Sequence, residues 1–333
     1  MPFHLQHRHL DNDSGFAYRI SAMADFFHLA VAWDWELDRD FIALLESQMH
    51  AHRLLFYSIS HHNTHETARR VQRGDLAFGA FLDRAGDIDD HFTHISRIIR
   101  KTPTHFVNPP DAVYHATDKA TMHLEFLTKG IEVPFSIIIT PYNKRKEVEL
   151  TLSDLARLGR PFIIKPANTT GGGIGVIVGA ESLKDVIESR QHHKNDKYLL
   201  QEKIRPEMLN GRKGWFRVFY VYGLVIPCWW DDETHRYFMI TREEHEAFGL
   251  RPLTTITKKI REVCRLDFFS TEIAVTRDNR FVVVDYVNDV CDMRVQSEHY
   301  DGVPDQVVMD ICRRLARYLK NAQAEGLLAA ANA

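Results

Sequence analysis

Apolar runs and helically spaced segments alternate along the first third of the chain. The apolar runs predict three buried strands, at residues 26–33, 53–60 and 75–84. Helical spacing over residues 38–52 places a helix between the first two strands. Because strands that alternate with helices are typical of a parallel sheet with crossover connections, we expect a small α/β domain over residues 25–112, preceded by a loose arm at 1–24.

After residue 112 the pattern changes to α+β, with more strands and fewer helices between them. Strands are predicted at residues 135–140, 161–167, 174–179, 197–204, 216–230, 269–275 and 280–287. Helices are predicted at residues 118–134, 148–159, 182–193 and 305–322. We therefore expect two further units, at 113–196 and 197–322, followed by a frayed, alanine-rich tail at 323–333.

Composition and charge narrow the classes of partner. The chain has 333 residues, of which 44% are hydrophobic, enough for more than one compact unit. Its net charge is −3 and its pI about 6.7, so no basic excess favours nucleic acid as a partner. No apolar run reaches the length of about 18 residues that indicates a membrane-spanning helix, so no membrane partner is expected.

Cysteine spacing bears on the cellular compartment. Four cysteines lie far apart and form no CxxC motif: Cys228, Cys264, Cys291 and Cys312. This spacing favours reduced thiols in a cytoplasmic protein over a disulfide framework or a zinc site. Whether the chain forms a homodimer stays open at this point.

The sharpest local motif is KPANTTGGGIG, which runs from Lys165 to Gly175. Three successive glycines let a backbone approach a ligand closely, and successive peptide N–H groups in such a loop bind anions. The motif lacks GK[ST], which excludes a Walker A loop, and a strand rather than a helix follows it, which excludes a dinucleotide fingerprint. Two interpretations remain: a glycine-rich flap between antiparallel strands over phosphates, or a tight hairpin with a solvated lysine.

Two acidic residues lie in consecutive apolar strands near the end of the chain. Glu272 is in the first strand and Asp285 in the second, and the turn at 277–279 predicts antiparallel pairing that brings the two carboxylates together. Asn288 follows, and two carboxylates with an amide oxygen form a hard oxygen site that suits Mg²⁺. The alternative is an acidic side chain on the outer face of an amphipathic strand.

Three elements occur in order along the chain: Lys119 at the start of a helix, Lys165 before the glycine loop, and the set Glu272, Asp285 and Asn288. Together they resemble the ATP-grasp superfamily, especially its glutathione-synthetase-like members of carboxylate–amine ligase type. The resemblance covers nearly the whole chain. It implies an N-terminal preATP-grasp α/β domain followed by two lobes that clamp ATP, with Mg²⁺ or Mn²⁺ as the metal.

The resemblance also implies roles for individual residues. Lys119 and Lys165 resemble the lysines that hold the ATP phosphates, and Arg217 resembles the arginine that faces the γ-phosphate and the acyl-phosphate intermediate. The flap is implied at Thr170, Gly171, Gly172 and Gly173. The hinge, whose backbone contacts the adenine, is implied at Gln201, Glu202, Lys203 and Ile204. The metal ligands are implied at Glu272, Asp285 and Asn288.

The strand that carries Arg217 is apolar on both faces, since Phe219 and Val221 share its face while Phe216 and Val218 lie on the other. We therefore expect a central strand covered on both sides. A covered arginine needs an anionic partner, which favours a functional arginine over a surface one.

Two features depart from the family pattern. The family usually ends with an acid, one residue and an asparagine, whereas two residues separate Asp285 from Asn288, so strict alternation would point them to opposite faces. A β-bulge would restore convergence; otherwise Asp289 or Asp292 is the alternative third ligand. The segment CDMRVQS replaces the family's proline–glycine ending, and its Arg294 is either a catalytic contact to substrate or γ-phosphate, or a surface arginine.

These residues predict an ATP-dependent ligase that activates a substrate carboxylate as an acyl phosphate for attack by an amine or similar nucleophile. The expected partners are ATP and a small carboxylate-bearing molecule. A kinase of a polyol or inositol phosphate is the alternative on the same fold, although the predicted substrate side is only mildly basic. A non-catalytic ATP-binding regulator is a third interpretation, disfavoured by the retention of both lysines, Arg217 and the metal ligands.

The chain contains 19 histidines, several of them within residues 50–65. His61 and His62 follow a predicted strand, at the edge where open α/β sheets bind ligands. Contact with an anionic substrate and a solvated loop are the two interpretations of this segment. A transition-metal site is not favoured, because the sequence shows no histidine pair matched with carboxylates on one helix.

Overall fold

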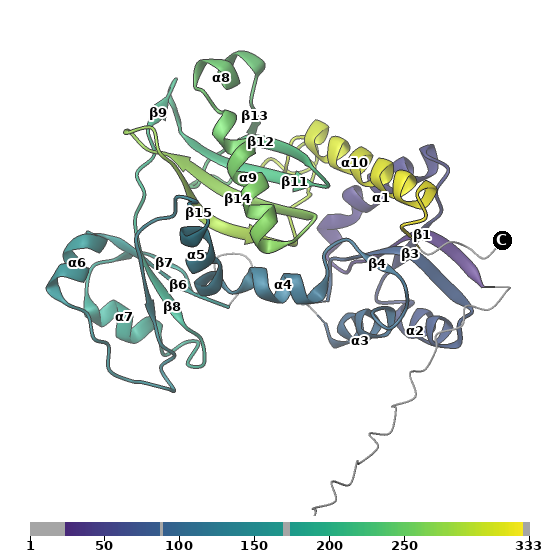
Figure 1. Cartoon of the computed structure of the whole chain (residues 1–333), viewed down its shortest axis with the longest axis horizontal. Helices are drawn as coiled ribbons and strands as arrows, with labels where there is room; N and C mark the ends of the chain where they lie inside the picture. The colour runs from purple at the N-terminus through teal and green to yellow at the C-terminus, as the bar shows by residue number, and fades with distance from the viewer. Residues whose placement is uncertain (1–23, 87–88, 169–173, 329–333) are drawn as a thin grey trace, which may run out of the picture.

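The computed structural model describes residues 24–86, 89–168 and 174–328 and contains three larger β-sheets and a two-stranded ribbon (Figure 1). The first sheet is parallel, in the order β2-β1-β3-β4. Its strands are β1 (Asp25–Ala32), β2 (Phe56–Ile59), β3 (Leu76–Asp83) and β4 (His105–Phe106). Alternate residues of β1 face different cores. Leu29 and Val31 pack in one core, and Ala30 and Ala32 pack in the core on the other face of the sheet. The predicted parallel α/β sheet is confirmed.

Helices cover both faces of this parallel sheet. They are η1 (Glu36–Asp38), α1 (Arg39–Ala51), α2 (Thr64–Arg73), α3 (Asp90–Ile99) and α10 (Asp305–Ala324). Helices α1 and α10 pack on one face, and α2 and α3 pack on the other. The sequence pattern predicted α1 and α10 but not α2 or α3. Helix α2 has a weak apolar signal, because its only buried apolar side chains are those of Ala68 and Val71.

The second sheet is antiparallel, in the order β5-β8-β6-β7. Its strands are β5 (Ser136–Ile139), β6 (Phe162–Pro166), β7 (Ile177–Ala180) and β8 (Tyr198–Glu202). Helices α6 (Leu152–Leu158) and α7 (Leu183–Ser189) pack against it through Leu158 and Val186. Strand β8 pairs with both β5 and β6, so this sheet continues to Glu202. The boundary expected between 196 and 197 falls before this last strand of the sheet.

The third sheet is also antiparallel, in the order β13-β12-β11-β14-β15. Its strands are β11 (Trp215–Val221), β12 (Leu224–Trp230), β13 (Tyr237–Met239), β14 (Phe268–Val275) and β15 (Phe281–Asn288). Nearby elements are the ribbon strands β9 (Met208–Leu209) and β10 (Arg212–Lys213) and the helices α8 (Arg242–Ala247) and α9 (Arg251–Cys264).

One predicted strand, 216–230, is wrong: it is a hairpin of β11 and β12. The turn lies at Tyr222 and Gly223, which have φ values of 40° and 87°. Positive φ at both central residues matches the right-handed twist of a two-residue hairpin. The apolar run continues through the turn, so hydrophobicity alone did not reveal the break.

Helices of the central segment also complete the core of the third sheet. Helices α4 (Pro110–Thr117) and α5 (Lys119–Thr128) share a core with α9 and the sheet, where Phe126 and Leu253 are fully buried. On the opposite face, Phe219 and Val221 pack with α10 and the N-terminal sheet. The three sheets are therefore joined through shared cores rather than by linkers.

The expected frayed tail is partly ordered. Helix α10 continues to Ala324, and Leu328 is buried at 7% exposure. Its apolar face packs against α1, which the alanine-rich composition did not indicate. Residues 329–333 lie outside the described residues.

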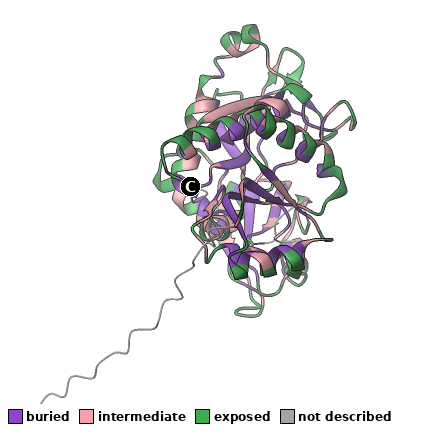
Figure 2. Cartoon of the chain, turned by 90° about the vertical axis from the view of Figure 1, so that its right-hand side faces the viewer, coloured by how far each residue is buried: buried purple, intermediate pink, exposed green. Residues whose placement is uncertain are grey.

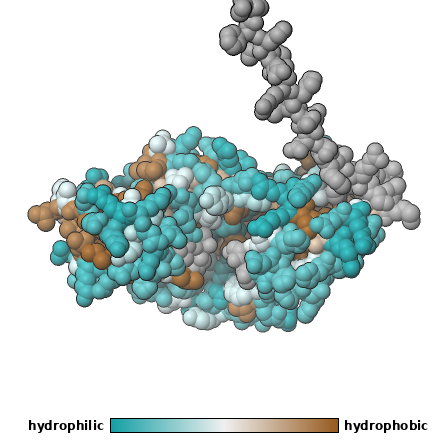
Figure 3. All heavy atoms as spheres, turned by 90° about the horizontal axis from the view of Figure 1, so that it is seen from below, coloured by the Kyte–Doolittle hydropathy of each residue, from teal (hydrophilic) through white to brown (hydrophobic). Residues whose placement is uncertain are grey.

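Buried residues are concentrated in the strands and on the inner faces of the helices, while the outer helix faces are exposed (Figure 2). On the face seen in Figure 3, hydrophilic residues predominate and apolar residues form separate patches. None of the helices in the described part of the chain combines the length and hydropathy of a membrane-spanning helix. The four cysteines are buried and unpaired.

Candidate functional site

A row of polar side chains crosses the third sheet. Arg217 on β11 lies opposite Glu272 on β14, and Glu272 lies opposite Asp285 on β15. The guanidinium of Arg217 forms an ion pair of 2.6 Å with Glu272 and lies 4.9 Å from the ring centroid of Trp230. The strand is central and covered on both faces, as its apolar pattern predicted.

Arg217 is held in its charged form by this environment. Burial would lower its pKa, but the carboxylate of Glu272 raises it above the ordinary value. Its side chain is 15% exposed, and its Nε atom is buried without a hydrogen-bond partner among the described residues. A buried donor without a partner has a desolvation cost that an anionic ligand would offset.

The bulge required for the third ligand is present. Residues 270 and 272 of β14 pair with residues 288 and 285 of β15, so two steps on one strand face three on the other. Asn288 consequently lies on the same side as Asp285 and donates from Nδ2 to Asp285 Oδ2 at 2.9 Å. The side chains of Asp285 and Asn288 therefore lie together, as a β-bulge allows and strict alternation would not.

The donor set fits a magnesium ion. Glu272 accepts one hydrogen bond from Trp215 at 3.0 Å and the ion pair from Arg217, each through a different oxygen, so each oxygen keeps a lone pair. Turning the amide of Asn288 would present its oxygen beside the carboxylate of Asp285. Two carboxylates and an amide oxygen are ligands that Mg²⁺ accepts together with water.

The two predicted lysines approach this row from the neighbouring sheet and helix. Lys165 on β6 donates to the carbonyl oxygen of Val284 on β15 at 2.9 Å, which links the second and third sheets. Lys119 begins α5, and its peptide N–H donates to the carbonyl oxygen of Ala167 at 3.0 Å. Lys119 and Lys165 therefore approach β15 from two different elements.

The charges of this group are mutually dependent. Burial would raise the pKa of Asp285, but Lys165, Lys119, Arg217 and the hydrogen bond from Asn288 lower it below the ordinary value. Burial lowers the pKa of Lys119, and the nearby charge of Lys165 lowers it further, against the attraction of Asp285. Asp285 thus lies among three cations at the interface between two sheets, and one of these cations, Arg217, is also ion-paired with Glu272.

The predicted hinge contains residues whose side chains are hydrogen-bonded within the protein and residues whose peptide groups are not. The side chain of Gln201 is 1% exposed and donates to Ser136 and Tyr286, both at 3.1 Å, so it connects the sheets instead of facing a ligand. Glu202 accepts from the peptide N–H of Phe135 at 2.7 Å. No hydrogen bond between described residues uses the peptide groups of Lys203 or Ile204, which follow the end of β8.

The flap residues Thr170, Gly171, Gly172 and Gly173 lie outside the described residues. The strands on either side, β6 and β7, pair antiparallel as predicted. Asn168 is fixed by hydrogen bonds to Asp196, the shortest 2.8 Å. Gly175 has φ +75°, and a Cβ there would lie 3.3 Å from His193 and Pro166. Both ends of the segment are therefore closely held.

Arg294 has a different environment from Arg217. It forms ion pairs with Asp292 at 2.8 Å and Asp301 at 3.0 Å, and its side chain is 18% exposed. These carboxylates raise its pKa despite burial. The contacts of Arg294 thus stabilise the loop after β15, and Asp292 is engaged there instead of beside Asp285.

A pocket of about 570 Å³ opens beside the end of β15. It lies where the three sheets meet: its wall includes Asn168 before the flap, Asp289 after β15, and the α3 side chains Arg97 and Arg100. Arg100 forms an ion pair with Asp111. Sequence reasoning missed Arg97 and Arg100, because α3 was not predicted and its exposed arginines resemble ordinary solvated residues.

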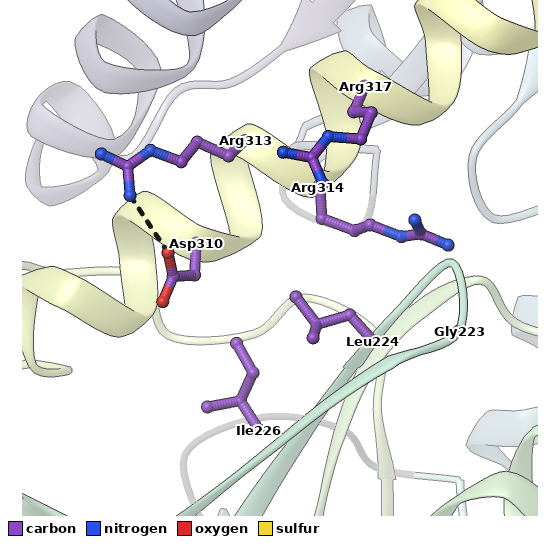
Figure 4. A pocket seen from close by; sticks show the side chains of 7 residues that line it. All are labelled: Gly223, Leu224, Ile226, Asp310, Arg313, Arg314 and Arg317. Atoms are coloured by element: carbon purple, nitrogen blue, oxygen red, sulfur yellow. Dashed lines mark hydrogen bonds and ion pairs between the residues drawn. The ribbon is translucent and has the colours of Figure 1, made fainter.

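A second hollow, of about 430 Å³, lies between α10 and the β11–β12 turn (Figure 4). Arg313 pairs with Asp310, and Arg314 donates to the carbonyl oxygen of Tyr222 at 2.8 Å. The guanidinium groups of Arg313, Arg314 and Arg317 point in different directions. They do not converge on one anion, and none of the predicted site residues lines this hollow.

Comparison with solved structures identifies the fold. The D-cycloserine synthetase DcsG is 13% identical, with a TM-score of 0.60 over 89% of this chain and 100% of that one. A RimK-domain ATP-grasp protein from Sphaerobacter thermophilus is 18% identical, with a TM-score of 0.58 over 87% of this chain and 98% of that one. The ATP-grasp ligase PsnB, complexed with minimal precursor, Mg and ADP, is 14% identical, with a TM-score of 0.56 over 92% of this chain and 100% of that one.

The three-sheet architecture defines a protein in which two antiparallel sheets meet beside a parallel α/β domain. It has the ATP-grasp fold, as the resemblance in the sequence implied. No protein-family model matches the sequence, and no curated protein matches it either.

Proposed function

We propose that the protein is an ATP- and Mg²⁺-dependent ligase that activates a substrate carboxylate. The observation that carries this proposal is the position of Asp285, among the cations Lys119, Lys165 and Arg217, where the second and third sheets meet. Cations placed beside carboxylates that can hold a metal ion are what a polyphosphate with its Mg²⁺ requires. The structure of PsnB complexed with Mg and ADP has the same fold, which supports the proposal.

The nucleotide would lie between β6, β8 and β15. Lys119 and Lys165 would bind phosphate oxygens, with Lys165 leaving the carbonyl oxygen of Val284 to do so. The free peptide groups of Lys203 and Ile204 would bind the adenine edge. Thr170, Gly171, Gly172 and Gly173 would cover the phosphates. Gln201 would not contact the adenine; its side chain would instead fix the hinge through its hydrogen bonds to Ser136 and Tyr286.

Glu272, Asp285 and Asn288 would hold Mg²⁺, which neutralises phosphate charge when bound. Arg217, next to Glu272, would stabilise the charge that develops as the γ-phosphoryl group moves to the substrate carboxylate and ADP leaves. The product is an acyl phosphate. An amine then attacks the acyl carbon and releases phosphate. Arg294, paired with Asp292 and Asp301, would act by fixing the loop and not by touching the substrate.

The substrate would occupy the pocket lined by α3 and α4. Arg97 has no ion-pair partner among the described residues, whereas Arg100 is paired with Asp111. We therefore assign Arg97 to an anionic group of the substrate, because a guanidinium binds a carboxylate through two parallel hydrogen bonds. Tyr114, which is 84% exposed at the pocket, would pack against the remaining part of the substrate.

An isotope experiment tests the reaction class. The full-length protein is incubated with ATP, Mg²⁺ and panels of carboxylates and amines, and the release of ADP and phosphate is measured. With a carboxylate labelled with ¹⁸O, a ligase transfers one labelled oxygen to phosphate, because the carboxylate oxygen attacks phosphorus and stays with it. A phosphorylated alcohol without free phosphate would instead identify a kinase. Nucleotide binding without turnover under every combination would favour a regulator.

The substrate pocket is tested separately. Arg97→Gln is expected to raise the KM for the carboxylate substrate at least tenfold with little change in ATP affinity. Arg73→Gln, at an arginine in the last turn of α2, is the matched control. An unchanged KM in Arg97→Gln would contradict the assignment of this arginine without affecting the nucleotide site.

A further inference from the structure

A group of imidazole and carboxylate side chains lies at the carboxyl edge of the N-terminal parallel sheet, after β2 and β3. His61 follows the end of β2, Asp89 is the N-cap of α3, and His91 lies in its first turn. One ligand atom from each of the three lies within 4.8 Å of the others. Both segments follow the carboxyl ends of parallel strands, where loops from neighbouring strands meet.

The contacts within this group fix its geometry. Asp89 Oδ1 accepts from the peptide N–H of His91 at 2.7 Å and lies 2.6 Å from the ring Nδ1 of His91. The ring centroids of His61 and His65 lie 5.5 Å and 5.0 Å from that of His91. The helix cap thus holds Asp89 and His91 together, while the turn before α2 brings His61 to them and the first turn of α2 brings His65.

We propose that His61, Asp89 and His91 form a binding site for a divalent transition metal, with Zn²⁺ as the best match. Two imidazole nitrogens and one carboxylate oxygen suit Zn²⁺, whereas Mg²⁺ prefers oxygen ligands alone. A bound ion would replace the proton between Asp89 and His91. Ligand atoms at metal bonds of about 2.0–2.2 Å lie roughly 3–3.5 Å apart, and the three ligand atoms here lie within 4.8 Å of one another, so small side-chain movements would complete the site.

The fourth position has two sources. His65 lies in the first turn of α2 and its ring contacts that of His91 edge to face, so a change of its side-chain rotamer would bring a third imidazole to the ion. Water would otherwise fill the position, as in sites with three protein ligands. The site is exposed on its outer side, because His61 and His91 are both exposed, so an ion can enter from solvent.

Metal binding at this site would affect the substrate pocket, because α3 carries residues of both. Thr93, two residues after His91, donates to the carbonyl oxygen of Gly86 at 2.7 Å, and both residues line that pocket. Arg97 and Arg100 lie further along the same helix. An ion that joins α2 to the start of α3 would therefore hold fixed the helix that carries these arginines.

The sequence did not favour this site, because it shows no histidine pair matched with carboxylates on one helix. The partners of His61 come instead from a segment about thirty residues away, joined to it only by the sheet order β2-β1-β3. The glycine flap, Lys119 and Asp285 take no part in it. The site can therefore be tested without the nucleotide site.

The test uses the full-length protein, stripped of metal by a chelator and titrated with Co²⁺ while the visible absorption is followed. Zn²⁺ is then added in competition and its affinity measured by calorimetry. We expect one saturable site with the intense absorption of low-coordinate Co²⁺. His61→Ala and His91→Ala should each weaken binding at least tenfold, the usual size of such losses.

Three controls separate this site from others. His94→Ala removes an exposed histidine of the same helix outside the group and should change the affinity less than twofold. A variant with His4, His7 and His9 changed to alanine excludes binding by the N-terminal arm. Asp285→Asn excludes binding of the added metal by the magnesium ligands.

Folding and nucleotide binding are checked on the same variants. Melting of metal-free His91→Ala should match that of the metal-free parent, and its affinity for ATP with Mg²⁺ should be unchanged. The proposal is overturned by the absence of a saturable site in the parent. It is equally overturned by unchanged binding in both His61→Ala and His91→Ala, or by an equal loss in His94→Ala.

Discussion

The Asp285 row and the pocket beside it are built by different means. Arg217, Glu272 and Asp285 project from the interiors of paired strands, so the sheet register sets their separation. Arg97 and Tyr114 project from the surfaces of α3 and α4, and their positions depend on how these helices pack. Neighbouring side chains directly across two strands are held about 5 Å apart, while a helix can shift by comparable distances between related proteins.

This difference separates chemistry from specificity. A fixed row suits phosphoryl transfer, where a displacement of about 1 Å costs much of the rate. A pocket lined by helix surfaces can change its side chains without disturbing the row. We therefore expect changes in the Asp285 row to affect turnover, metal and nucleotide, and changes in the pocket to affect the carboxylate substrate.

The largest effect is expected for Arg217→Lys. Turnover should fall on the order of a hundredfold, because the guanidinium acts on charge that develops during transfer. ADP affinity should stay near normal, since ADP lacks the γ-phosphate and lysine keeps the charge beside Glu272. Steady-state kinetics and ADP calorimetry measure the two quantities. The control is Arg261→Lys, at an arginine of the same lobe that is ion-paired with Asp267. Equal losses of turnover and ADP affinity in Arg217→Lys would show that Arg217 has a structural role instead.

Asp285→Asn should produce the next largest effect. The Mg²⁺ concentration for half-maximal activity should rise about 10–100-fold, because a ligand carboxylate is lost while the side-chain volume is kept. Asp289→Asn is the matched comparison, since Asp289 lies beyond the bulge and lines the pocket. If Asp289→Asn alters the magnesium dependence more than Asp285→Asn, Asp289 and not Asp285 is the carboxylate that holds the metal.

Lys165→Ala should weaken nucleotide binding at least tenfold. A hydrogen bond to a charged group is worth about 1.5–3 kcal/mol, and removal of the ammonium leaves the phosphate without it. Lys203→Ala should stay within twofold of the parent, because only its backbone is assigned to the adenine. Calorimetry with ADP decides between them. Equal affinities for Lys165→Ala and the parent would exclude a phosphate contact.

The smallest expected effect is the uptake of a proton by Lys119 when the nucleotide binds. The pKa of Lys119 in the free protein is below the ordinary value of about 10.4, and bound phosphate would raise it again. At alkaline pH between these two pKa values, binding therefore takes up a fraction of a proton, and affinity falls as pH rises. Calorimetry in two buffers with different ionisation enthalpies measures the uptake. Lys119→Arg, which stays charged, should abolish it while keeping most of the affinity.

The sequence by itself determined the elements with strong local signals. Alternation predicted that β11 is central, since both of its faces are apolar. Acids in consecutive apolar strands predicted the pairing of Glu272 with Asp285, because one short turn fixes the register of a hairpin. The order of Lys119, Lys165 and these acids was enough to indicate the ATP-grasp fold.

Only the tertiary structure decided how distant segments meet. The bulge in β15 turns Asn288 toward Asp285, and no residue between them signals it. Gln201 faces the core because Tyr286 of another sheet lies opposite, which local sequence cannot show. His61 meets Asp89 and His91, and Arg97 meets the pocket, through the order of parallel strands. Such contacts depend on packing between segments far apart in the chain, whereas alternation and turns depend on neighbours.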